Sequence, residues 1–102
     1  MEQGEDPTVV SFRTQIDAAD ERLVELINQR LGLVAGLHAH KREQGYSTVD
    51  PDRERKMLER LDAANAGPLS DAGLRQLYAA VIPLCTEEAR RINDTVEPAG
   101  ER

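Results

Sequence analysis

A chain of 102 residues with a formal net charge of −6 forms at most one small domain and offers no broad cationic surface for nucleic acid or anionic membranes. The single Cys85 excludes an internal disulfide and metal sites built on cysteine pairs, which fits a reducing compartment. No apolar run approaches about 18 residues, and residues 1–7 lack the apolar core of a secretion signal. We therefore expect a soluble, cytoplasmic protein.

The first residues are polar and include Gly4 and Pro7, so we expect residues 1–8 to form a flexible lead-in. Either Asp6 or Thr8 can cap the helix that follows.

The dominant pattern of the chain is a stripe that runs from Phe12 to Lys41 and predicts one long helix, ending near Gln44 before Gly45. The stripe repeats about every 3.5 residues, as expected for one face of a helix that packs on other helices. Its members are Arg13, Ile16, Asp20, Leu23, Ile27, Arg30, Val34, Leu37 and Lys41.

Three cations stand on this stripe where apolar residues are expected: Arg13, Arg30 and Lys41. A buried cation is costly unless it meets an anion, and Asp20 can pair with one of them at most. One interpretation is that these long side chains reach solvent at the edges of the helix. The other is that the stripe lines a pocket for an anionic ligand.

Distances along the helix constrain the second interpretation. At about 1.5 Å per residue, Arg30 and Lys41 lie roughly 16 Å apart and can flank one small ligand, whereas Arg13 is about 25 Å from Arg30. If all three cations serve one site, Arg13 must come from an antiparallel helix of a second chain. The pocket hypothesis therefore predicts a homodimer.

A second helix is predicted from Pro51 to about Ala64, because Asp50 suits the N-cap and Pro51 suits the first helical position. The sequence Asn-Ala-Gly-Pro at 65–68 ends it.

A third helix is predicted to begin after Ser70, a good N-cap. Pro83 falls inside it and predicts a kink or an end to the regular helix. Ile92 is the last residue assigned to the core, so residues 9–92 form the expected helical domain and 93–102 a disordered tail.

The predicted fold class is therefore all-α, with one long and two shorter helices. The long helix cannot bury its whole face on two short partners, so pairing with the same helix of a second chain is expected.

The order of these motifs resembles the all-helical family of chorismate mutases over residues 12 to 90. The matching pieces are Arg13, Ile16, Asp17 and Asp20; Leu26, Ile27 and Arg30; Lys41; Asp50, Arg53 and Glu54; and the run Gly-Pro-Leu-Ser at 67–70. The resemblance implies an intertwined dimer of three-helix chains, in which each active site takes an arginine from the neighbouring first helix.

The resemblance also implies roles for individual residues. Arg30 would bind one substrate carboxylate, and Arg13 of the other chain would bind a second. Lys41 would hold a carboxylate and the ether oxygen, and Arg53 would support the carboxylate site. Glu54 would accept from the ring hydroxyl with the backbone near Asp50.

Taken without the resemblance, Arg53 and Glu54 read as ordinary surface charges at the start of a helix. His38 and His40 have no Cys or carboxylate partners at ligand spacing, so we predict no metal site and no cofactor.

The third helix departs from the family, whose members commonly carry Ser or Thr and then Gln or Glu. An ungapped match places Cys85 at the hydroxyl position and Ala89 at the amide position. Since Ala89 cannot donate a hydrogen bond, Glu88 is assigned as the donor to the ether oxygen. Only a protonated Glu88 can do this, so turnover should favour lower pH. As the lone cysteine on an apolar face, Cys85 reads as a small packed residue rather than a nucleophile.

The implied reaction is the rearrangement of chorismate to prephenate, with no covalent intermediate. Fixed cations would hold the dianion in its reactive shape and stabilise charge on the ether oxygen. Two alternatives stay open. One is a same-fold enzyme acting on 4-amino-4-deoxychorismate or isochorismate, and the other is a non-catalytic helical dimerisation or regulatory module.

Overall fold

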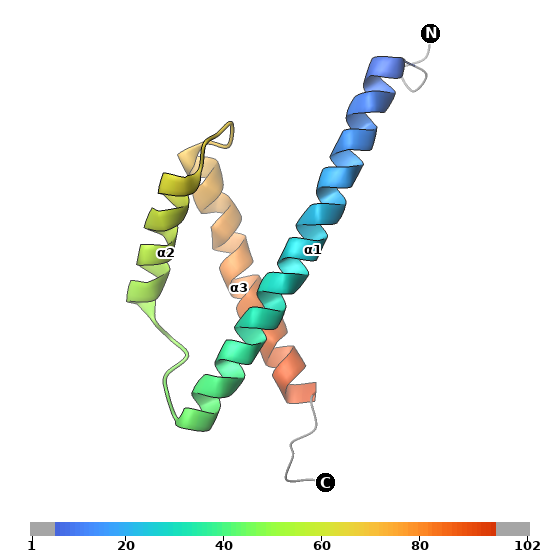
Figure 1. The fold of residues 1–102 in the computed structure, drawn as a ribbon. Coiled ribbons are helices and arrows are strands. Elements are labelled where there is room, and N and C mark those ends of the chain that lie inside the picture. Colours follow the sequence, from blue (N-terminus) through green and yellow to red (C-terminus); the bar gives the residue numbers. More distant parts are fainter. Residues whose placement is uncertain (1–5, 96–102) are drawn as a thin grey trace. The chain divides into compact units, whose positions relative to one another are not determined.

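The computed structural model describes residues 6–95 of the chain, and this part is all-helical without strands (Figure 1). It contains α1 (Pro7–Gln44), α2 (Pro51–Ala64) and α3 (Asp71–Thr95). No helix in the described part is long and apolar enough to cross a membrane. The chain divides into two units, Met1–Arg30 and Leu31–Arg102, which are described separately below.

Both ends of α1 are set by local hydrogen bonds. The Thr8 amide donates to Oδ1 of Asp6 at 2.8 Å, so Asp6 is the N-cap and the helix begins at Pro7. Pro7 and Thr8 therefore belong to the helix, although the sequence assigned them to the lead-in; residues 1–5 lie outside the described part. At the other end Gly45 has φ +73°, and the Tyr46 amide donates to the Lys41 carbonyl at 2.8 Å, which closes the last turn.

In the first unit, the apolar face of α1 is open to solvent. Phe12, Ile16 and Leu23 each expose more than half of their surface, at 62%, 55% and 57%. Within its own unit this face therefore has no apolar cover.

In the second unit, α2 and α3 form a helical hairpin (Figure 1). Asp50 caps α2 by accepting from the Arg53 amide at 3.1 Å, and Pro51 is the first helical residue, as the sequence predicted. Ser70 caps α3 by accepting from the Gly73 amide at 3.0 Å. An ion pair between Arg75 and Asp62 links the two helices.

A narrow buried stripe on α3 supplies most of the core among the described residues. Its buried members are Leu74, Val81, Cys85 and Ala89, and Met57 of α2 and Ala35 of α1 complete the buried set.

The end of α3 lies further along the chain than predicted. Of the two outcomes predicted at Pro83, a kink or an end, the helix does not end there; it continues, with Val81 and Cys85 buried on either side of the proline. It also includes Asn93 to Thr95, which the sequence assigned to the tail. Asn93 is held because its side-chain amide donates to the Ala35 carbonyl at 3.2 Å. Residues 96–102 of that tail lie outside the described part.

Because Ser70 caps α3, its substitution should lower the stability of the protein. Ser70→Ala removes the acceptor for the Gly73 amide, and we expect a loss of about 1 kcal/mol, or a fall in Tm of about 4 to 8 °C for a domain of this size. Thermal denaturation followed by circular dichroism at one protein concentration measures it. Ser11→Ala is the control, because Ser11 lies inside α1 and is exposed. An equal shift in both variants would contradict the capping role.

Candidate functional site

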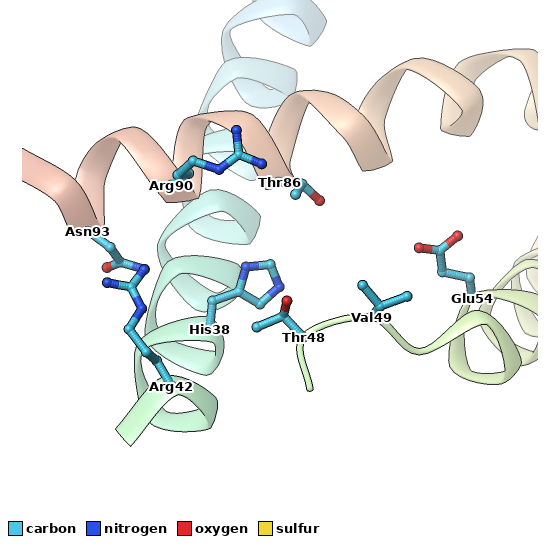
Figure 2. A pocket seen from close by; sticks show the side chains of 8 residues that line it. All are labelled: His38, Arg42, Thr48, Val49, Glu54, Thr86, Arg90 and Asn93. Carbon is cyan, nitrogen blue, oxygen red and sulfur yellow. The ribbon is translucent and has the colours of Figure 1, made fainter. Parts of the chain in front are cut away.

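The second unit contains a pocket of about 230 Å³ where its three helices and a loop meet (Figure 2). Pockets for drug-sized ligands start at about 300 Å³, so this one suits a small molecule. Its lining comes from α1, from the α1–α2 loop, from the first turn of α2 and from α3: His38 and Arg42, Thr48 and Val49, Glu54, and Thr86, Arg90 and Asn93.

The pocket is cationic although the whole chain is acidic. Arg42 and Arg90 bring two positive charges to its lining, and Glu54 brings one negative charge. The pKa of His38 is lowered by its partial burial, and then by the neighbouring charges of Lys41 and Arg42, so His38 is neutral near pH 7. An excess of fixed positive charge therefore lines the pocket and favours an anionic ligand.

Short-range hydrogen bonds position the loop and α2 at the pocket. The Ser47 hydroxyl accepts from the Val49 amide at 3.1 Å and donates to the Val49 carbonyl at 3.2 Å. The Glu54 amide donates to the Asp50 carbonyl at 3.2 Å in the first turn of α2. Thr48, Val49 and Glu54 therefore reach the pocket from one short, well-defined segment.

The wall from α3 carries two polar side chains one turn apart, Thr86 and Arg90. The Thr86 hydroxyl donates to the Ile82 carbonyl at 3.0 Å, and its oxygen retains acceptor capacity. Nη1 of Arg90 donates to both carboxylate oxygens of Glu87 at 3.0 Å. This ion pair is exposed, and it uses one of the three guanidinium nitrogens.

Among the residues that the sequence predicted as a site, Glu54 lines this pocket. Lys41 is half-buried beside Arg42 in the last turn of α1. Asp50 and Arg53 are exposed at the start of α2. Arg42, which the sequence analysis did not select, lines the pocket instead of its neighbour Lys41.

The two remaining predicted cations, Arg13 and Arg30, belong to the first unit. Arg13 is exposed and Arg30 is half-buried in α1.

The residues of α3 that line the pocket lie one position after those that the ungapped family match selects. Cys85 is 2% exposed and Ala89 is fully buried, so neither faces the pocket. Glu88 is half-buried; Oε1 of its carboxylate accepts from Nε of Arg91 at 3.0 Å and lies 2.9 Å from Nη2 in an ion pair. The pair that faces the pocket, Thr86 and Arg90, keeps the same four-residue spacing one residue further along.

The spacing of apolar residues in the sequence already indicates which face of α3 is buried. Leu74 and Val81 continue at helical spacing into Cys85 and Ala89, and all four are small or apolar. Such a stripe predicts the buried face of a helix, so the polar residues next to it are the better candidates for a site.

Within residues 6–95 no group of three or more His, Cys, Asp or Glu side chains is arranged to hold a metal ion.

Comparisons with known proteins agree on one family. The model of the family described as chorismate mutase type II matches residues 12–90. The bifunctional chorismate mutase/prephenate dehydratase of Neisseria gonorrhoeae is 31% identical over 86 residues, covering 83% of this chain. The chain spans only 23% of the length of that relative. The solved structure of chorismate mutase (form II) from Thermus thermophilus superimposes with a TM-score of 0.78 at 27% identity, covering 82% of this chain and 96% of that one.

The burial of Cys85 predicts a protected thiol. In the native protein, 5,5′-dithiobis(2-nitrobenzoic acid) should react at least about tenfold more slowly than in denaturant, because buried structural cysteines are inert. Absorbance of the released thiolate follows the reaction, and the denatured sample gives the full count of one thiol. Fast reaction of the native protein would show that Cys85 is accessible, as the sequence-based assignment requires.

Proposed function

The chain belongs to the chorismate mutase type II family, and we propose that it rearranges chorismate to prephenate. The observation that carries this proposal is a small cationic pocket in an acidic chain whose residues 12–90 match the family.

The reaction is an isomerisation within one molecule. A carbon–oxygen bond of the ether breaks while a carbon–carbon bond forms, and no proton, electron or group enters or leaves. The protein must hold a flexible dianion in its compact reactive shape and stabilise the negative charge that grows on the ether oxygen. Fixed cations and hydrogen-bond donors suffice for both tasks.

The proposed binding of the substrate carboxylates rests on arginine and lysine. Arg30 binds one carboxylate, because its planar guanidinium donates two parallel hydrogen bonds. Arg53 supports that site from α2. Lys41 offers a compact charge to a carboxylate and the ether oxygen. Arg42 adds to the positive potential that draws the dianion into the pocket.

The proposed hydroxyl site lies at the start of α2. Glu54 lines the pocket and accepts from the ring hydroxyl together with the backbone near Asp50. On α3, Thr86 takes the position that the sequence analysis gave to Cys85, because Thr86 lines the pocket and Cys85 is buried.

We also propose that the working form is a homodimer in which Arg13 of one chain completes the site of the other. Two observations support it: Phe12, Ile16 and Leu23 are exposed on α1, and Arg13 lies beside them. Burying such a face stabilises a dimer by about 25 cal/mol per Å² of apolar surface. The proposed location is the cytoplasm, which suits a lone unpaired cysteine.

The proposed activity predicts loss of chorismate absorbance on addition of the protein, with prephenate as the product. Arg30→Ala should lower kcat/KM by about 10- to 150-fold, the equivalent of one lost charge-assisted hydrogen-bonding group of about 1.5 to 3 kcal/mol. Arg22→Ala is the matched control, because Arg22 is exposed on the same helix. Turnover of 4-amino-4-deoxychorismate or isochorismate in place of chorismate would reassign the substrate. Binding of chorismate without turnover would favour the non-catalytic module.

A shared site predicts complementation between two impaired variants. When Arg13→Ala and Arg30→Ala proteins are mixed and allowed to exchange subunits, one pocket of each mixed dimer is intact. Because about half of the dimers are mixed and each has one of two pockets intact, about a quarter of the wild-type turnover should return. Mixing Arg13→Ala with the double variant is the control, since no intact pocket forms. No recovery after confirmed exchange would defeat the shared site.

A further inference from the structure

The pocket wall from α3 presents a permanent cation, and we propose that Arg90 stabilises the negative charge that grows on the ether oxygen. This assigns to Arg90 the role that the sequence analysis gave to a protonated Glu88. The inference rests on the proposed function, because it concerns the same site and the same substrate.

The geometry of α3 separates the two candidates. Arg90 lines the pocket together with Thr86, one turn earlier on the same face (Figure 2). Successive residues of an α-helix turn by about 100°, so Glu88 points about 200° away from Arg90. Oε1 of Glu88 accepts from Nε of Arg91 at 3.0 Å and lies 2.9 Å from Nη2 of the same side chain. Glu88 is therefore absent from the pocket lining and is paired with Arg91.

The chemistry also favours arginine. The ether oxygen gains negative charge as its bond to carbon breaks, so a donor aimed at it binds the transition state more tightly than the substrate. A carboxyl group can donate only when protonated, whereas a guanidinium is always charged and always a donor. Arg90 therefore needs no proton uptake to act.

Arg90 can serve this role without losing its partner on α3. Glu87 accepts only from Nη1 of Arg90, at 3.0 Å to each oxygen, and leaves Nε and Nη2 to face a ligand. An exposed ion pair three residues apart contributes little and is readily exchanged for a ligand.

Other titratable and charged groups face the same pocket. His38 and Arg42 come from α1, Glu54 comes from the first turn of α2, and Glu87 lies beside Arg90 on α3. Partial burial, and then the charges of Lys41 and Arg42, lower the pKa of His38. The Arg90→Lys variant keeps the positive charge at position 90, so its pH profile is directly comparable with that of the wild type, whereas Arg90→Met and Arg90→Glu also change the charge near His38.

The test is a set of substitutions at one position, with chorismate turnover measured from about pH 5 to 8. Arg90→Met should lower kcat by about 100- to 1000-fold, as for loss of an oxyanion donor, and change KM far less. Arg90→Lys should restore part of kcat, because it restores a cationic donor. Arg90→Glu should work only as the neutral acid, so its activity relative to wild type should fall as pH rises.

Arg91→Met is the matched control, because Arg91 is the next residue, is exposed and does not line the pocket. We expect it to keep the wild-type kcat. Wild-type kcat in Arg90→Met, with a helical signal equal to that of Arg91→Met, would overturn the inference while leaving the proposed function intact. An Arg90→Glu profile parallel to wild type would overturn it as well. A wild-type protein that does not convert chorismate would instead overturn the proposed function, and this inference with it.

Discussion

The burial of one face of α3 is the constraint on which the pocket depends. Leu74, Val81, Cys85 and Ala89 are all buried, and Ala89 has no exposed surface. A helix can present only one face to its neighbours, so burying this stripe fixes the rotation of α3 about its own axis. If α3 were rotated about its axis by about 100°, the angle between successive residues, other side chains would stand at the pocket wall in place of Thr86 and Arg90. The chemistry of the wall is therefore set by apolar packing behind it.

Sequence reasoning worked where the determinants are local. Asp50 and Pro51 mark the start of α2, and Asp6, one of the two predicted caps, marks the start of α1, because caps and fixed proline geometry act within a few residues. Sequence reasoning failed where contacts between residues distant in the sequence determine how far a helix extends. Packing on both sides of Pro83 keeps α3 helical, and a hydrogen bond to the Ala35 carbonyl holds Asn93 in the last turn.

The candidate site shows the same division. Glu54 was predicted from the resemblance to the family, since local reasoning alone made it an ordinary surface charge, and the structure places it in the pocket lining. Arg42 was missed because it lies one residue beyond the stripe that selected Lys41. On α3, an ungapped family match placed Cys85 and Ala89 at the two polar positions, and Glu88 was assigned in place of Ala89. The spacing of Cys85 and Ala89 from Leu74 and Val81 is that of the buried stripe, and the structure buries all four.

The cations of such a site are not equivalent in what they contribute. Rearrangement leaves both carboxylates of the substrate in place, so groups that bind carboxylates bind substrate, transition state and product similarly. They provide affinity and orientation, which appear mainly in KM and in the populated shape of the substrate. The ether oxygen gains negative charge in the transition state, so the group facing it determines kcat more directly. In the proposed role, the guanidinium of Arg90, which lines the pocket, is a strong donor that needs no proton uptake.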